Sequence, residues 1–174
     1  EKLLEEGAKP LAILRDKNKN AFLKHIIEKI TVRQADLLNF HEAKDALHDA
    51  DIVINCAARV GGIEYNIKHA GSIFRENMQT FLNVIEASRQ NNVERFVVVS
   101  SACVYPRFCT IPTPEDEGFK DRPEPTNEGY GWSKRMEEFV GQAYAKEYGM
   151  TIAIVRPYNG YGPRDNFHPE SSHV

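Results

Sequence analysis

Short apolar runs alternate along the chain with longer segments of helical period, and this alternation constrains the fold more than any other feature. Two of the runs, residues 52–54 and 96–99, are continuous and rich in β-branched residues, which is typical of strands buried on both faces of a parallel sheet. Further strands are predicted over residues 10–14, 30–32 and 152–155. Because strands and helices alternate, the sequence predicts an α/β fold with a doubly wound parallel sheet.

Three helices are predicted between these strands, over residues 40–47, 72–90 and 129–148. In the second, apolar residues recur at the spacing of one helix face. In the third, the corresponding stripe consists of Met136, Phe139, Val140 and Ala143. Gly149 stands where a C-terminal glycine cap belongs. Residues 1–174 are therefore expected to form one domain. It is expected to be truncated at both ends, because the chain opens on what resembles the tail of a helix and stops after a polar loop.

Composition excludes several classes of protein. A net charge of -3 with interspersed signs, 41% hydrophobic and 27% charged residues indicate an ordinary globular domain. Since there is no basic cluster and no apolar run near the roughly 20 residues of a bilayer span, neither nucleic acid nor a membrane is expected as a partner. Cys56, Cys103 and Cys109 are an odd number without metal-ligand spacing, which predicts no metal site and a reducing, cytoplasmic location. Cys56 follows a predicted strand and is expected in the core.

Three polar residues indicate a catalytic site: one follows a predicted strand, and two lie in the first turns of a predicted helix. Ser101 follows the strand at 96–99, and Tyr130 and Lys134 stand four residues apart, on one face of the last predicted helix. A nearby ammonium stabilises a phenolate, so the tyrosine can exchange a proton with a sugar hydroxyl while a hydride moves to or from a nicotinamide. The serine hydroxyl can bond to the same oxygen. The alternative is a surface pair on a helix, and the strand–motif–helix order favours catalysis.

These residues and several others resemble the extended short-chain dehydrogenase/reductase family, the NAD-dependent epimerases and dehydratases. Ser101, Tyr130 and Lys134 match the family's catalytic triad. Asn77 matches its structural asparagine, and Arg156 begins a segment, residues 156–163, that resembles its loop against the nicotinamide and the substrate. The resemblance covers nearly the whole chain and implies a Rossmann-like fold.

The resemblance also implies binding sites. Cofactor-binding residues would be Asp36, Leu37, Ala57, Ala58, Tyr130, Lys134 and Pro157, and substrate-binding residues would be Asn159 and Arg59. The cofactor would be NAD or NADP, because the strand at 10–14 is followed by both an arginine and an aspartate. The chain lacks the family's Gly-x-x-Gly-x-x-Gly turn, which cradles the pyrophosphate. By itself it is therefore expected to bind a dinucleotide weakly or not at all and to be inactive.

The residues after Ser101 separate the members of this family. The 4,6-dehydratases carry Asp-Glu there, whereas this chain has Ala102 and Cys103. A cysteine in this place resembles GDP-L-fucose synthases and GDP-mannose 3,5-epimerases, and residues 60–63, 124–128 and 165–174 resemble the GDP-L-fucose synthases. That resemblance implies a nucleotide-sugar epimerase/reductase that works through a 4-keto sugar. Cys103 would be the base and His173 the acid of the epimerisation.

Other interpretations remain open from the residues alone. Cys103 could be a small buried hydrophobic residue, and Arg59 could line a solvated loop. The protein could instead be a UDP-sugar 4-epimerase of the same family, or a non-catalytic Rossmann-like binding module. A homodimer through the two long helices is expected from the family, although packing against the sheet explains one apolar stripe on each.

Overall fold

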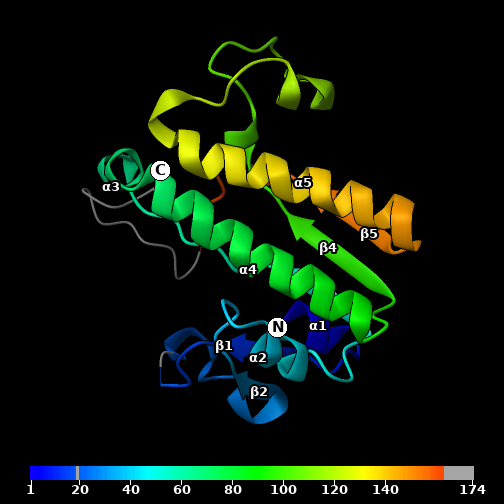
Figure 1. Cartoon of the computed structure of the whole chain (residues 1–174). Coiled ribbons are helices and arrows are strands. Elements are labelled where there is room, and N and C mark those ends of the chain that lie inside the picture. The colour runs from blue at the N-terminus through cyan, green and yellow to red at the C-terminus, as the bar shows by residue number, and fades with distance from the viewer. Residues whose placement is uncertain (19, 163–174) are drawn as a thin grey trace.

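The structure, a computed structural model, describes residues 1–18 and 20–162 and is built from alternating strands and helices (Figure 1). The strands are β1 (Leu11–Leu14), β2 (Thr31–Gln34), β3 (Ile52–Asn55), β4 (Arg95–Val99) and β5 (Thr151–Val155). The α-helices are α1 (Lys2–Glu5), α2 (Phe40–Ala46), α3 (Ile63–Lys68), α4 (Ala70–Gln90) and α5 (Glu128–Tyr148). Single 3-10 turns are η1 (Ala21–Leu23), η2 (Ile27–Lys29), η3 (Ala102–Val104), η4 (Glu115–Phe119) and η5 (Pro125–Asn127).

All strand pairs among the named strands are parallel, which confirms the predicted α/β class. They form two sheets: β1 pairs with β2, and β3, β4 and β5 pair in that order. The predicted single sheet is thus divided into two sheets. Because parallel strands end at the same edge, the carboxyl ends of β3, β4 and β5 lie together and position the loops that follow them.

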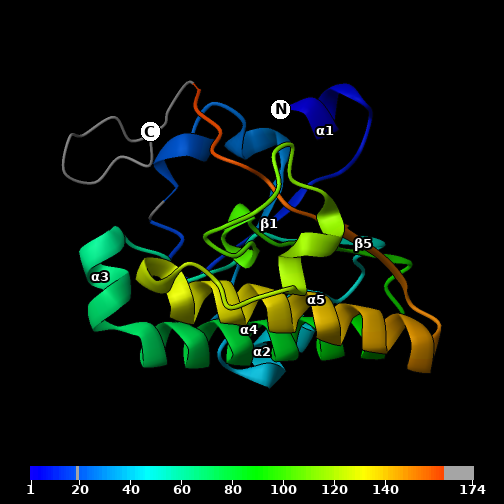
Figure 2. The ribbon, with the colours of Figure 1, turned by 90° about the horizontal axis from the view of Figure 1, so that it is seen from above.

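The long helices α4 and α5 lie side by side in both views and cover one face of the larger sheet (Figures 1 and 2). Alternate strand residues point into this interface: Val53, Phe96 and Val98 are buried there. Phe81 of α4 meets Phe96 edge-on, with 5.9 Å between ring centroids. The hydrophobic core therefore sits between β3–β5 and the helices.

The opposite face of the larger sheet is open in the part of the chain that the structure describes. Ile52 and Ile54 are 53% and 48% exposed, whereas Val53 between them is buried. The prediction that β3 is buried on both faces was therefore wrong, because helices cover only one face of this strand. Cys56 is likewise exposed rather than in the core. No helix within residues 1–18 and 20–162 has the length and hydropathy needed to cross a bilayer.

Helix ends follow local sequence signals. The Asn39 side chain accepts the backbone N–H groups of His41 and Glu42 and so caps α2. Gly149 ends α5 in the left-handed region at φ 70°, which confirms the predicted glycine cap. Helix α3 was not predicted from the sequence.

The buried face of α5 differs from the predicted apolar stripe. Phe139, assigned to that stripe, is 60% exposed. The residues that α5 buries are instead small or charged: Gly131, Ser133, Lys134, Arg135, Glu137, Glu138 and Gly141. Gly141 is one reason for this arrangement, because a Cβ there would lie 3.1 Å from Val98, so the helix approaches the sheet closely.

Candidate functional site

A tight turn after β4 forms the centre of the site. Ser101 starts this turn, and its Oγ accepts the N–H of Cys103 at 3.1 Å. The N–H of Ala102, the residue between Ser101 and Cys103, donates to the carbonyl of Pro157 at 3.0 Å. The turn after β4 is thereby tied to the segment that follows β5, so residues from two strand ends share one place.

The first turn of α5 packs directly on this segment and brings Tyr130 to it. A Cβ on Gly131 would lie 2.5 Å from the carbonyl oxygen of Cys103, so glycine is required for the approach. Ser101 lies close enough to the Tyr130 hydroxyl to act on the pKa of that group. Burial raises the pKa of Tyr130 to about 12, and the neighbouring Cys103 and Glu137 act in the same direction. Ser101 acts in the opposite direction.

Lys134 completes this cluster from one helical turn further along α5. Its side chain is 2% exposed, and its Nζ lies 5.7 Å from the centroid of the Tyr130 ring. The Nζ donates to the carbonyl of Val99 at 2.9 Å and to Glu137 Oε2 at 2.8 Å. Ser101, Tyr130 and Lys134 thus converge at the carboxyl end of β4, as the sequence predicted; their catalytic role stays a prediction.

Of the other predicted catalytic, cofactor and substrate residues, some lie at the turn after β4 and others lie away from it. Cys103 is half-buried in the same turn as Ser101. Pro157 contacts that turn through its carbonyl, and Asn159 is exposed two residues further on. His173 lies outside the described residues, as do residue 163 at the end of the predicted 156–163 loop and the whole 165–174 segment.

A cavity of about 600 Å³ opens beyond the carboxyl ends of β1, β2 and β3. Its wall includes the predicted cofactor residues Asp36, Leu37, Ala57 and Ala58, together with Ile13, Arg15, Ala35, Leu38, Arg59, Glu76, Asn77 and Thr80. The wall after β2 is held from two helices. Glu42 Oε2 accepts the N–H of Asp36 at 2.8 Å, and Asn83 Nδ2 donates to the carbonyl of Leu37 at 2.9 Å.

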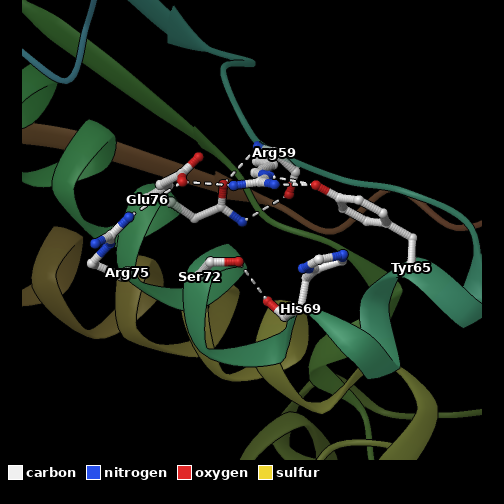
Figure 3. Close-up of polar contacts among 7 residues, drawn as sticks. Arg59, Tyr65, His69, Ser72, Arg75 and Glu76 are labelled. Atoms are coloured by element: carbon white, nitrogen blue, oxygen red, sulfur yellow. Dashed lines mark hydrogen bonds and ion pairs between the residues drawn. The ribbon is translucent and has the colours of Figure 1, made fainter.

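Arg59 is held in the cavity wall by partners from α3 and α4 (Figure 3). Its Nη1 forms an ion pair with Glu76 at 2.6 Å, and its Nε donates to the Tyr65 hydroxyl at 2.9 Å. These hydrogen bonds, the one with Tyr65 first, raise the pKa of Arg59 above its ordinary value. Arg59 is therefore a fixed cation at the cavity rather than a side chain of a solvated loop.

Asn77 connects the cavity to the serine–tyrosine–lysine cluster. Its Oδ1 accepts the N–H of Arg59, and its Nδ2 donates to the Arg59 carbonyl and to Ser133 Oγ. Ser133 precedes Lys134 and donates its hydroxyl to the Tyr130 carbonyl at 2.8 Å. One buried asparagine thus fixes the loop after β3 against the start of α5.

Sequence reasoning missed the buried carboxylates of α5. Glu138 accepts the Ser100 hydroxyl at 2.5 Å and two bonds from the guanidinium of Arg156. Glu137 pairs with Lys134, and burial raises the pKa of Glu137 to about 7. Only the spacing offered a signal, because Tyr130, Lys134 and Glu137 follow one helix face.

Comparison with known proteins places this arrangement in a family. The model of the NAD-dependent epimerase/dehydratase family matches residues 1–174. A GDP-L-fucose synthase of Escherichia coli strain K12 is 36% identical, over 84% of this chain and 47% of its own length. A GDP-L-fucose synthase of Dictyostelium discoideum is 41% identical, over 70% of this chain and 38% of its own length.

Solved structures agree with these relatives. The GDP-L-fucose synthetase from Naegleria fowleri bound to NADP has a TM-score of 0.73 and 26% identity, covering 94% of this chain and 54% of that one. The chain spans less than half the length of the two curated relatives and about half of the solved one. With a family model that matches its whole length, the chain belongs to the NAD-dependent epimerase/dehydratase family.

Proposed function

We propose that the protein is a nucleotide-sugar epimerase/reductase that acts through a 4-keto sugar with NAD or NADP, like the GDP-L-fucose synthases it resembles. The observation that carries the proposal is one turn after β4 that holds both Ser101 and Cys103 against Tyr130 and Lys134. A serine–tyrosine–lysine cluster serves keto reduction, and a thiol beside it serves proton transfer at carbon. The identities of 36% and 41% to GDP-L-fucose synthases support this substrate class.

The residues present fit a nicotinamide dinucleotide. Asp36, Leu37, Ala57 and Ala58 would hold the adenosine end in the cavity beyond β1–β3. Tyr130, Lys134 and Pro157 would hold the nicotinamide end beside β4. When bound, this cofactor supplies or accepts the hydride at the sugar carbon. Arg15 in the cavity wall is a suitable partner for a 2′-phosphate, and Asp16 beside it for a ribose hydroxyl, so both NAD and NADP remain in the proposal.

The chain's own residues would each have one task. Tyr130 donates its proton to the keto oxygen, Ser101 orients that oxygen, and the Lys134 ammonium stabilises the resulting phenolate. For epimerisation, the keto group acidifies the neighbouring C–H bonds, and Cys103 as thiolate removes the proton from one face. His173 would return a proton to the other face. Arg59 and Asn159 would bind the nucleotide sugar.

A reaction in deuterated water tests this proposal. The full-length parent protein that contains residues 1–174 is incubated with NADPH and a GDP-linked 4-keto-6-deoxyhexose, and cofactor oxidation is followed together with deuterium in the product. We expect oxidation of NADPH and deuterium at both carbons beside the keto group. Cys103→Ser should slow deuterium incorporation and leave keto reduction largely intact. Turnover of a UDP-hexose with no deuterium at those carbons would contradict the proposal and indicate a 4-epimerase.

We further infer that residues 1–174 are part of an NAD(P)-binding Rossmann domain with the start of a substrate-binding region near residue 174. The division of the strands into two separate sheets, β1–β2 and β3–β4–β5, supports this inference. Since a glycine-rich phosphate turn is absent from these 174 residues, calorimetry on this chain should give a dissociation constant for NADPH well above the micromolar range. Micromolar affinity would contradict the inference.

A homodimer through α4 and α5 and a cytoplasmic location complete the proposal. Phe74 and Leu82 of α4 and Phe139 of α5 are partly exposed on the two helices. Apolar side chains exposed together are typical of interfaces between copies.

The cysteines concern the proposed cytoplasmic location. Cys56, Cys103 and Cys109 are all free thiols, which supports a reducing compartment.

A further inference from the structure

A carboxylate lies beneath the serine–tyrosine–lysine cluster without any assigned task. Glu137 is 1% exposed and lies between α5 and the end of β4. Its Oε2 pairs with Lys134, while its Oε1 has no hydrogen-bond partner within the described residues. Burying a carboxylate with one oxygen unsatisfied is costly. A helix that only needed to pack on the sheet would place an apolar side chain here.

The partners of Lys134 show what this carboxylate does. The ammonium is fixed by two acceptors on different elements, the Val99 carbonyl at the end of β4 and Glu137 on its own helix. The Tyr130 ring lies near the same ammonium, with its centroid 5.7 Å from Nζ. Removing Glu137 would leave the lysine held from the strand alone.

The same carboxylate alters the charge that Tyr130 experiences. When Glu137 is ionised, the pair Lys134–Glu137 has no net charge; when it is neutral, one positive charge remains under the phenol. The other charged groups nearby already have partners: Glu138 on α5 pairs with Arg156 after β5. Cys103 of η3 raises the pKa of Tyr130, and Ser101, which precedes η3, lowers it. Two groups can therefore change the charge of this cluster by ionising: Cys103, which acts on Tyr130, and Glu137, which pairs directly with Lys134.

We propose that Glu137 is a positioning residue whose buried carboxylate holds the Lys134 ammonium at the carboxyl end of β4 and sets the net charge beneath the Tyr130 ring. The proposal rests on the function proposed above, in which Tyr130 is the proton donor. It also gives the site a pH response: protonation of Glu137 unmasks the lysine charge and makes the Tyr130 proton easier to release.

Glu137→Gln tests this proposal, because it keeps the shape and an acceptor for Lys134 but removes the charge. Tyrosines are labelled with ¹³C at Cζ, the Tyr130 resonance is assigned with Tyr130→Phe, and the titration is followed without cofactor. We expect the pKa of Tyr130 to fall by roughly one unit or more in Glu137→Gln. Glu147→Gln, an exposed glutamate of the same helix, is the control and should leave the pKa unchanged. An unchanged pKa in Glu137→Gln would overturn the proposal.

A second measurement uses the wild-type protein, in case Glu137→Gln fails to fold. With lysines labelled at Cε, the Lys134 resonance should shift when Glu137 titrates near neutral pH; a Lys134 resonance that is flat across that range contradicts the proposal. The pH–rate profile of keto reduction then links the effect to function, with its alkaline limb moved to lower pH in Glu137→Gln. A wild type with no turnover would count against the proposed function, whereas the cofactor-free titrations would still decide the role of Glu137.

Discussion

At the scale of single residues, the site depends on a phenol that burial keeps protonated. Burial raises the pKa of Tyr130 to about 12, so at neutral pH its hydroxyl is protonated and can serve as the proposed proton donor. That state suits the reduction of a keto group, which takes up a proton at oxygen. Lys134, although close, is balanced by Glu137, so the charge that would lower this pKa is partly offset.

Removing the Tyr130 hydroxyl should therefore stop proton donation without disturbing the fold. We expect Tyr130→Phe to lower the kcat of keto reduction by roughly 10²–10⁴-fold, the usual contribution of a general acid. Tyr148→Phe, which changes a half-exposed tyrosine at the far end of the same helix, should leave kcat within about twofold. Steady-state oxidation of NADPH measures both. Equal loss in the two variants would mean that the effect is structural.

Stability should depend on pH through Glu137. Its folded-state pKa, about 7, lies above the ordinary value of 4.5, so between these values the folded protein holds a proton that the unfolded chain has released. The free energy of unfolding should therefore fall as pH rises from 4.5 to 7, by at most about 3 kcal/mol from this group. Denaturant titrations at several pH values should show a shallower decline for Glu137→Gln than for Glu147→Gln. Identical slopes would contradict the assigned burial.

At the scale of elements, the close approach of α5 to the turn after β4 is set by glycine. A Cβ at Gly131 would meet the Cys103 carbonyl at 2.5 Å and Pro123 at 2.7 Å, so helix and turn would have to separate. We expect Gly131→Ala to lower the free energy of unfolding by about 1–3 kcal/mol, as overpacking does, and to lower keto reduction as well.

Gly71, in the first turn of α4, provides the matched control for Gly131. A Cβ there meets nothing within 4 Å, so Gly71→Ala should be neutral or stabilise the protein by up to about 1 kcal/mol through helix propensity. Thermal and denaturant unfolding compare the two variants. A Gly131→Ala protein as stable and as active as Gly71→Ala would show that the turn and α5 are not in close contact.

The elements also show which parts of the fold the sequence could and could not predict. Strands of consecutive β-branched residues were found within a residue or two, because their pattern is local. The serine–tyrosine–lysine cluster was found because its spacing and position after a strand are sequence features. The buried face of α5 was not found. A prediction from hydrophobic periodicity assumes that buried residues are apolar. Glu137 and Glu138 are buried nevertheless, because they form ion pairs with Lys134 and Arg156. These ion pairs exist only in the folded chain.

At the scale of the whole molecule, two surfaces expose apolar side chains. The face of the larger sheet that carries Ile52 and Ile54 has no helix on it among the described residues, and the sheet is divided beside β3. The second open surface is formed by α4 and α5, which lie side by side on the other face (Figure 2). Exposed apolar side chains on both the sheet face and the helix surface are typical of surfaces that pack against another segment or another protein.

The surface of α4 and α5 supports the last prediction, which concerns assembly. Phe139 is 60% exposed on α5, and in a dimer with twofold symmetry each copy contributes the same residue, so Phe139→Lys would place two positive charges in one interface. We expect the dimer dissociation constant to rise by roughly tenfold or more, as for loss of a buried aromatic anchor. Phe108→Lys is the control, since Phe108 is 88% exposed on the loop between η3 and η4. Sedimentation velocity over a concentration series measures both variants. A wild type that stays monomeric, or an equal effect of both substitutions, would exclude dimerisation through these helices.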